Sequence, residues 1–309
     1  MRILIWHVHG SWTTAFVQGR HEYLVPVVAD RGPDGRGRAD TWDWPASVRE
    51  VSPEQLADEP VDVVILQRAV ELERAEVWLR RRPGLDVPAV CLEHNAPQGR
   101  INELRHWAAD RRDLLVVHVT HFNDLFWDTG HTPTRVIEHG IVDPGYRYTG
   151  ELPRAAVVVN EARRRGRVTG TDLLARLGAD VPLDVFGMDA ARLGGYENPP
   201  QETLHTEMAR RRVYLHPIRW TSLGLSLLEA MHLGMPVVAL ATTEVPEAVP
   251  PEAGIISTRV DALRNALRRL LDDPEQARAM GKAAREAALA RYGLQRFLAD
   301  WDRVLAEVA

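Results

Sequence analysis

One carboxylate interrupts an apolar helical stretch in the second half of the chain. Glu229 lies within TSLGLSLLEAMHLGMPVVAL, residues 221–240, between two glycine turns. The first turn ends at Gly224, and Leu225 and Ser226 begin the predicted helix. A helix N-terminus offers unpaired N–H groups and the positive end of a dipole, and a glycine lets a ligand approach the backbone. These residues predict a phosphate site, with a carboxylate more than one turn into the helix that could face a ribose hydroxyl.

A cluster of arginines follows the first predicted strand of the second half. Its members are Arg163, Arg164, Arg165 and Arg167. The planar fork of a guanidinium suits phosphate oxygens, so the cluster predicts a second anion contact. For any single arginine, a solvated surface position remains an equal alternative.

Two residues of the first half are predicted at the carboxyl ends of strands, where ligands bind in open α/β sheets. Gly10 lies between the first strand and the first helix, so a ligand can approach the backbone there. His94 ends the predicted strand VPAVCLEH. A lone histidine is often structural, and for His94 that alternative also stays open.

Short apolar runs alternate with helical patterns and must position these residues. The strands predicted in the first half are 3–8, 22–28, 61–67, 87–94, 114–120 and 135–140, and those in the second half are 155–160, 182–187, 212–217, 236–240 and 253–257. Between the halves, residues 141–153 are rich in Pro and Gly and read as a linker. This alternation predicts two Rossmann-like doubly wound domains of parallel strands facing a cleft, with boundaries at 1–148 and 149–290. From residue 261 the chain reads as helical, and 291–309 is predicted to pack back on the first domain.

Composition excludes several classes of protein. The 309 residues are 45% hydrophobic and 26% charged, which suits a globular protein with two cores. A formal net charge of -5 argues against a dedicated nucleic-acid binder. A single cysteine, Cys91, excludes an internal disulfide framework and fits a reducing compartment. No run reaches the roughly 18 to 20 apolar residues of a membrane span, so we expect a cytoplasmic protein. Peripheral membrane contact and the oligomeric state stay open.

The stretch around Glu229 resembles the donor-site signature of retaining nucleotide-sugar glycosyltransferases of the GT-B fold, specifically glycosyltransferase family 4. That signature is Glu, seven residues and Glu around a Gly-Leu helix start, followed by Ala-Met, Gly-x-Pro and a buried strand. By this resemblance Glu229 holds the donor ribose. Thr221 stands eight positions earlier, where the family usually has its first acid, near the sugar and the leaving diphosphate. The departure concerns the catalytic apparatus rather than donor binding.

The resemblance extends to three other stretches. Thr169 and Gly170 occupy the place of a Lys-Gly pair in a loop where family members clasp the donor diphosphate with Arg and Lys, so the arginine cluster can keep the cationic role. His94 matches a histidine that faces the donor sugar in family members. VIEHGIVDP, residues 136–144, matches the family's Val-Ile-Pro-Asn-Gly-Val-Asp and marks the end of the first domain.

The function that the resemblance implies is transfer of a sugar from a nucleotide-diphospho-sugar to an acceptor hydroxyl, with retention of configuration. Donor binding is expected mainly on residues 150–285 and acceptor binding on 1–148. Because cationic side chains and a helix dipole can neutralise the diphosphate, we expect neither a metal nor a cofactor beyond the donor. The alternatives are a nucleotide-sugar epimerase or hydrolase of the same fold, and a degenerate homologue kept as a binding or scaffold partner. The sugar, the base and the acceptor are not identified by the sequence.

Overall fold

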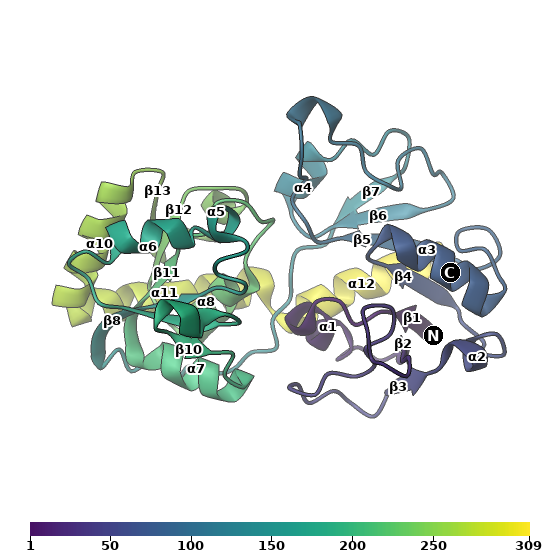
Figure 1. The fold of residues 1–309 in the computed structure, drawn as a ribbon, viewed down its shortest axis with the longest axis horizontal. Helices are drawn as coiled ribbons and strands as arrows, with labels where there is room; N and C mark the ends of the chain where they lie inside the picture. Colours follow the sequence, from purple (N-terminus) through teal and green to yellow (C-terminus); the bar gives the residue numbers. More distant parts are fainter. The chain divides into compact units, whose positions relative to one another are not determined.

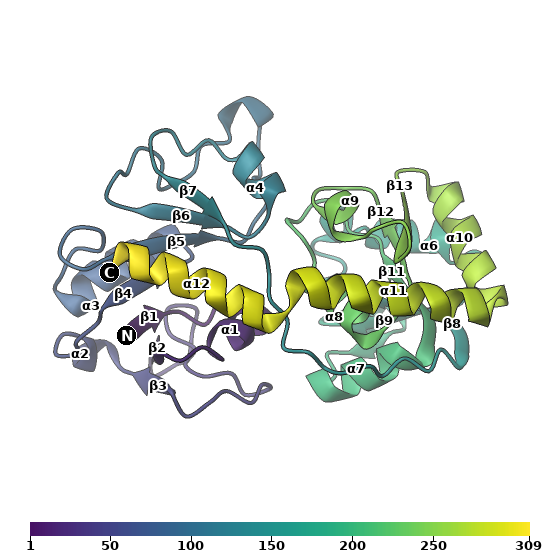
Figure 2. The same ribbon diagram turned by 180° about the vertical axis from the view of Figure 1, so that it is seen from behind.

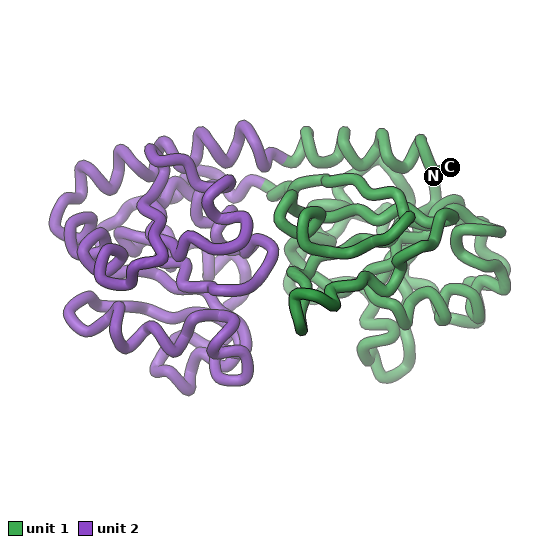
Figure 3. The backbone as a smooth tube through the Cα atoms, turned by 90° about the horizontal axis from the view of Figure 1, so that it is seen from above, with its two compact units in different colours: residues 1–142, 294–309 green, residues 143–293 purple.

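The computed structural model describes residues 1–309 and divides the chain into two compact units (Figure 3). Unit 1 comprises Met1–Val142 with Leu294–Ala309, and unit 2 comprises Asp143–Gly293. The sequence analysis placed the first boundary six residues later, after residue 148. The intervening residues belong to unit 2 because their side chains bond there: Asp143 pairs with Arg285 at 2.7 Å, and the Tyr148 hydroxyl donates to the carbonyl of Arg212 at 2.9 Å.

Unit 1 is built on a sheet of seven parallel strands in the order β3-β2-β1-β4-β5-β6-β7 (Figure 1). The strands are β1 (Arg2–Ile5), β2 (Glu22–Pro26), β3 (Val48–Val51), β4 (Val63–Leu66), β5 (Ala89–Glu93), β6 (Leu115–His118) and β7 (Thr134–Val136). The helices are α1 (Gly10–Phe16), α2 (Pro53–Leu56), α3 (Ala69–Leu79) and α4 (His121–Phe126), with a 3-10 turn at Ile101–Glu103. The strands β4 and β5 are wholly buried, and β1 is buried from Ile3 onward, which explains their continuous apolar runs. The strand order reverses between β1 and β4, and this is the switch point of the sheet.

The last helix, α12 (Leu294–Val308), belongs to unit 1 and runs along its strands in Figure 2. Its buried aromatic residues join the aromatic core of α1. Trp301 lies edge-on to Phe16 with ring centroids 5.0 Å apart, and Phe297 lies edge-on to Trp12 at 5.8 Å. At the end of the same face, Asp302 contacts the buried His21 at 2.9 Å. An apolar stripe at helical spacing therefore marks the face of α12 that packs on the first unit.

Unit 2 is built on a second parallel sheet, in the order β10-β9-β8-β11-β12-β13. Its strands are β8 (Leu152–Val158), β9 (Leu183–Gly187), β10 (Tyr196–Glu197), β11 (Arg211–His216), β12 (Val237–Leu240) and β13 (Gly254–Ser257). Its helices are α5 (Gly166–Thr169), α6 (Leu174–Leu177), α7 (Gln201–Arg210), α8 (Leu225–Leu233), α9 (Val245–Ala248), α10 (Val260–Asp272) and α11 (Pro274–Tyr292), with 3-10 turns at Thr171–Leu173 and Ala190–Leu193. The strand order reverses between β8 and β11. Two doubly wound sheets confirm the predicted fold class.

Two strands escaped the sequence analysis. β3 and β10 are both edge strands, and edge strands bury less of their surface. β3 reads VREV, with only its two valines buried, and β10 has two residues, both exposed. Neither carries an apolar run long enough to be recognised by pattern.

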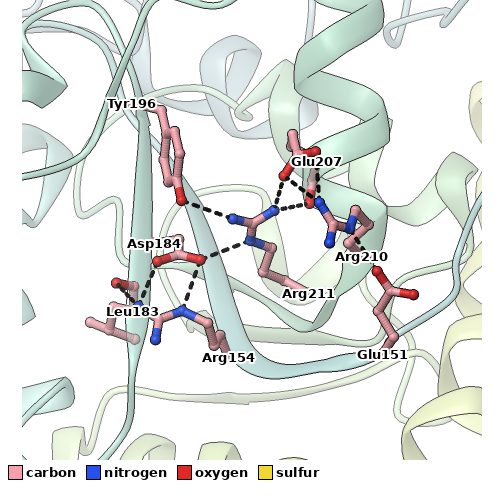
Figure 4. Close-up of polar contacts among 8 residues, drawn as sticks. All are labelled: Glu151, Arg154, Leu183, Asp184, Tyr196, Glu207, Arg210 and Arg211. Atoms are coloured by element: carbon pink, nitrogen blue, oxygen red, sulfur yellow. Dashed lines mark hydrogen bonds and ion pairs between the residues drawn. The ribbon is translucent and has the colours of Figure 1, made fainter.

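An ion-pair cluster ties together the amino ends of β8, β9 and β11 (Figure 4). Arg211, 3% exposed, donates to Asp184 at 2.8 Å and also contacts Glu207 on α7. Arg154 reaches the same Asp184 carboxylate at 2.6 Å, and the Arg211 guanidinium lies 5.4 Å from the ring centroid of Tyr196. Every charge in the cluster has a partner of opposite sign, as burial requires. The cluster therefore secures the end of the sheet opposite to the strand ends that carry the predicted site.

Candidate functional site

The structure brings the two predicted anion-binding stretches of unit 2 together. The arginine segment follows β8 and the glycine turn follows β11, so both leave the sheet at its switch point. The two loops touch through backbone: the N–H of Arg219 donates to the carbonyl of Val168 at 2.8 Å. Gly170 has φ +74°, and a Cβ there would lie 1.8 Å from the carbonyl oxygen of Pro217. Glycine is therefore required where the loops meet.

Arg219 is a residue of this site that the sequence analysis missed. Its guanidinium donates to the carbonyl of Arg167 at 2.9 Å and to Asp172 at 3.0 Å. Its side chain is 22% exposed, and it bridges the arginine segment to the loop that precedes α8. The nearest signal was its place three residues after the end of β11.

The glycine turn leads into α8 as predicted, with Gly224 as the N-cap residue and Leu225 as the first helical residue. A Cβ on Gly224 would lie 2.5 Å from Cε1 of His216, so a side chain here would collide with that ring. The hydroxyl of Ser226 lies 2.9 Å from the hydroxyl of Tyr214. The Ser226 side chain is thus already hydrogen-bonded within the protein, and its backbone N–H is the group that points to the helix N-terminus.

His216 ends β11 directly behind Gly224. The side chain is fully buried, and its Nε2 has no hydrogen-bond partner. Burial lowers the pKa of His216 to about 3, so the ring is neutral at physiological pH. Its Nδ1 lies 3.3 Å from the hydroxyl of Tyr214. His216 therefore places a neutral polar ring, rather than a charge, against the start of α8.

Glu229 lies on α8 and is 5% exposed. Its Oε2 lies 3.5 Å from Nε2 of His205 on the neighbouring helix α7, and His205 is itself 6% exposed. A carboxylate in an apolar helix needs a polar neighbour, and this histidine is one. His205 lies 24 residues away in sequence and carries no motif, so only the packing of α7 on α8 identifies it.

The four predicted arginines fall into two pairs. Arg164 is held by Glu161, with Nε 2.9 Å from the carboxylate, and Arg167 donates to Asp172 at 3.0 Å. Arg163 and Arg165 make no side-chain hydrogen bond or ion pair within the protein. The second pair is therefore available to an anion without breaking an existing contact.

Two threonines, Thr169 and Thr221, stand where the family pattern has a lysine and an acid, and they differ in burial and contacts. Thr169 is buried, and its hydroxyl donates to the carbonyl of Arg165 at 3.1 Å, within its own short helix. Thr221 is partly exposed in the loop before α8. Thr169 thus shapes the arginine segment, whereas Thr221 lies on the surface of the loop next to the glycine turn.

The residues predicted in unit 1 lie at the switch point of its own sheet. Gly10 begins α1 after β1, and a Cβ there would lie 3.1 Å from Nε1 of Trp42. His94 follows β5 and is buried against His9, with ring centroids 4.2 Å apart, and against Trp12 at 5.1 Å. Burial, together with the neighbouring His9 and His139, lowers the pKa of His94 well below its ordinary value. His94 is thus a neutral imidazole at physiological pH.

No group of three or more His, Cys, Asp or Glu side chains is arranged to hold a metal ion. No helix has both the length and the apolar character needed to cross a bilayer.

Part of unit 2 matches a known protein family in sequence. Residues 192–287 match the family Glycosyl transferases group 1. A GDP-mannose-dependent monoacylated alpha-(1-6)-phosphatidylinositol monomannoside mannosyltransferase of Corynebacterium glutamicum is 33% identical over 142 residues, which cover 45% of this chain and 31% of that protein. A GDP-mannose-dependent alpha-(1-6)-phosphatidylinositol monomannoside mannosyltransferase of Mycolicibacterium smegmatis is 35% identical over 145 residues, or 42% of this chain and 37% of that protein. These alignments span about a third of each relative, 31% of the first and 37% of the second.

Solved structures match the whole chain in fold. Sucrose-phosphate synthase from Thermosynechococcus elongatus has a TM-score of 0.74 at 15% identity, covering 99% of this chain and 98% of its own. HepE from Anabaena, in complex with UDP, has a TM-score of 0.69 at 15% identity, covering 99% of this chain and 100% of its own. The fold is therefore GT-B, and the predicted resemblance to glycosyltransferases of that fold is confirmed.

Proposed function

We propose that this chain is a glycosyltransferase that moves a sugar from a nucleotide-diphospho-sugar to an acceptor hydroxyl, with retention of configuration and without a metal ion. The observation that carries the proposal is the position of Gly224 and Glu229 within the segment 192–287 that matches the group 1 family. The start of a nine-residue helix, a glycine turn and a buried carboxylate lie there together at the switch point of a parallel sheet. This is the arrangement expected for a nucleotide diphosphate.

The proposed roles follow from the chemistry of each group. The backbone N–H groups at the start of α8 bind the diphosphate, and Glu229 accepts hydrogen bonds from the ribose hydroxyls. Arg163 and Arg165 provide charge to the diphosphate because neither is engaged in an ion pair. Fixed positive charge and oriented N–H groups stabilise a leaving diphosphate as it forms, which is why the proposal needs no metal. In unit 1, His94 is proposed to face the sugar.

The base and the sugar of the donor are proposed from the comparisons. Both curated relatives are named as GDP-mannose-dependent mannosyltransferases, whereas HepE was solved with UDP and with UDP-glucose. Sequence identity is higher for the first pair, at 33% and 35% against 14% and 15% for HepE. GDP-mannose is therefore the first donor to test, and UDP-glucose is the second.

A second candidate is a degenerate homologue that binds a nucleotide sugar without transferring it. Thr221 favours this alternative, because a threonine cannot provide the carboxylate that the family usually has at this position. The first candidate is preferred, since the glycine turn before α8, Glu229 and two arginines without an ion pair are present to bind the diphosphate and ribose.

A binding screen tests the donor site. Thermal unfolding of the full chain is followed with GDP-mannose, UDP-glucose, GDP, UDP and ADP. The proposal expects the nucleotides of one base to raise the Tm, and to raise it further as their concentration increases, because they bind the native state. Glu252→Gln is a matched control, since Glu252 is an exposed acid of unit 2 outside the site. A Tm that no nucleotide changes, at millimolar concentration, would contradict the proposal.

A further inference from the structure

Arg219 ties the arginine segment, residues 161–172, to the loop that precedes α8. Its guanidinium holds both carboxylate oxygens of Asp172, with Nη2 3.0 Å from Oδ2, and its Nη1 also donates to the carbonyl of Arg167 at 2.9 Å. The backbone N–H of Arg219 donates to the carbonyl of Val168 at 2.8 Å. One residue therefore bonds to three positions of the segment, through its backbone and through both terminal nitrogens of its side chain.

The two structures that Arg219 joins are each ordered by other bonds. The loop before α8 is held on its far side by the hydroxyl of Thr242, which donates to the carbonyl of Ile218 at 2.9 Å. Within the segment, the hydroxyl of Thr169 donates to the carbonyl of Arg165 at 3.1 Å. Loss of the Arg219 side chain should therefore change the position of the segment relative to the loop, rather than unfold either of them.

The charges around Arg219 favour an anion. Residues 161–172 and Arg219 together contain five arginines and two acids, an excess of three positive charges. Asp172 reduces this excess, and its Oδ2 accepts from both Arg219 and Arg167 at 3.0 Å each. Arg219, and then Arg167, hold the pKa of Asp172 below its ordinary value, so the carboxylate is ionised at physiological pH. The charge of Asp172 opposes binding of an anion, whereas its bonds hold the segment in place.

We propose that Arg219 is a positioning residue that acts through Asp172, and that it holds the arginine segment where Arg163, Arg165 and the N–H groups at the start of α8 bind one diphosphate together. Arg219 itself does not bind the anion. That the anion is the diphosphate of a sugar donor rests on the proposed function. The coupling of the two loops is a property of unit 2, and inorganic pyrophosphate, which has neither nucleoside nor sugar, is the probe that measures it.

Replacing Asp172 by Asn separates the bridge from the charge. The variant keeps the size of the side chain but loses its negative charge and its ionic bonds to Arg219. If charge alone mattered, removing an acid beside the arginines would tighten binding of pyrophosphate. The proposal expects the opposite sign, an affinity lower by about threefold to tenfold, because the segment is no longer held. Calorimetric titration of the full chain with pyrophosphate measures the change, and unchanged or tighter binding by Asp172→Asn overturns the proposal.

Two substitutions of Arg219 test the same point. Arg219→Lys keeps the charge but lacks the planar fork that reaches Asp172 and the carbonyl of Arg167 together. It is expected to lose affinity as Arg219→Gln does, by about threefold to tenfold, and wild-type affinity in Arg219→Lys overturns the proposal. The double variant Arg219→Gln/Asp172→Asn is expected to bind no more weakly than the weaker single variant, and additive losses also overturn it. The control is Arg268→Gln, which breaks an exposed pair with Asp180 outside the segment.

A further comparison separates positioning from general stabilisation. Replacing Arg163 and Arg165 together by Gln removes their contacts with the anion. The loss of affinity is expected to be smaller in the Arg219→Gln background than in the wild type, because the segment is already displaced. If Arg219 only stabilised the fold, the two losses would be equal, and that result contradicts the proposal. If Arg219→Gln fails to fold, Asp172→Asn serves as the background.

These outcomes differ from those of the proposed function. Pyrophosphate affinity that depends on Arg219 and Asp172 as described, in a protein that transfers no sugar, supports the positioning and contradicts the glycosyltransferase. Sugar transfer by a protein whose affinity is unchanged in Asp172→Asn and Arg219→Lys contradicts the positioning alone. A wild-type chain that binds no pyrophosphate contradicts the joint anion site.

Discussion

Nε2 of His205 lies 3.5 Å from Oε2 of Glu229, and the two side chains are 6% and 5% exposed. The pair joins helices α7 and α8, and Nε2 of His205 also lies 2.7 Å from Nε2 of Gln201 at the start of α7. Glu229 also lies within the segment 192–287 that matches the group 1 family, on the helix that begins after Gly224. We propose that its carboxylate binds the ribose of the donor.

Replacing Glu229 by Gln tests that inference. The substitution keeps the size of the side chain and removes its charge, so hydrogen bonds from ribose hydroxyls become weaker. Donor affinity is expected to fall by about 1.5 to 3 kcal/mol, or roughly tenfold to a hundredfold, with the Tm of the free protein close to wild type. Calorimetric titration with the nucleotide found in the screen measures the change, with Glu252→Gln as the charge-matched control. Wild-type affinity in a folded Glu229→Gln protein would disprove the assignment.

The arginines of residues 163–167 are expected to differ in how much they contribute to donor affinity. Of Arg163 and Arg165, the one that contacts the diphosphate is expected to weaken donor binding by about 1.5 kcal/mol or more when it is replaced by Gln. The reason is that a charge-assisted hydrogen bond is lost. Arg164→Gln breaks only its exposed pair with Glu161 and is expected to change affinity little.

The same titration, run in parallel with Arg176→Gln, measures these effects. Arg176 is an exposed arginine of α6 outside the segment. Equal affinities in the Arg163 variant, the Arg165 variant and their double variant would exclude both from the diphosphate site. The double variant is needed because either arginine could substitute for the other.

The buried cluster at the amino ends of the strands predicts a stability effect without a binding effect. Arg211→Met leaves the buried Asp184 with one arginine instead of two and removes one of the two arginines that pair with Glu207, so unfolding should become easier by about 3 kcal/mol. The neighbouring Arg210→Met removes only partly exposed pairs and should cost about 1 kcal/mol or less. Urea unfolding compares the two variants. If they lose equal stability, the cluster is not a main source of stability for this sheet.

His139 predicts how stability depends on pH. It is buried near His9 and Arg296, and burial lowers its pKa to about 3. In the unfolded chain this histidine is protonated below about pH 6.5, whereas in the folded chain it stays neutral until about pH 3. The free energy of unfolding therefore falls as the pH drops from about 6.5 toward 3. The substitution His139→Leu removes this contribution to the pH dependence of stability.

Between pH 7.5 and 5.5, the free energy of unfolding of His139→Leu should fall by about 1.4 kcal/mol less than that of the wild type. Urea unfolding at the two pH values measures the difference. Equal losses in the two proteins would show that His139 takes up its proton in the folded state.

Local pattern predicted the sheets and the helix that carries Glu229, because buried parallel strands and apolar helices leave continuous signals in sequence. It did not predict contacts that depend on which elements pack together. His205 meets Glu229 only because α7 packs on α8, and Gln67 meets His94 across 27 residues because β4 and β5 are neighbours. Arg219 carries no motif in the sequence, and only the fold shows that it bridges the arginine segment to the loop before α8.

The central claim is that this chain transfers sugar from a nucleotide donor, and donor turnover measures it most directly. The full chain is incubated with GDP-mannose or UDP-glucose and a panel of hydroxyl acceptors, including phosphatidylinositol mannosides in detergent, and released nucleoside diphosphate is followed together with the glycosylated product. The account predicts release that depends on an acceptor, yields product with the anomeric configuration of the donor, and proceeds in the presence of EDTA. Tight donor binding with no released nucleotide for any acceptor would contradict it and favour the degenerate binding protein.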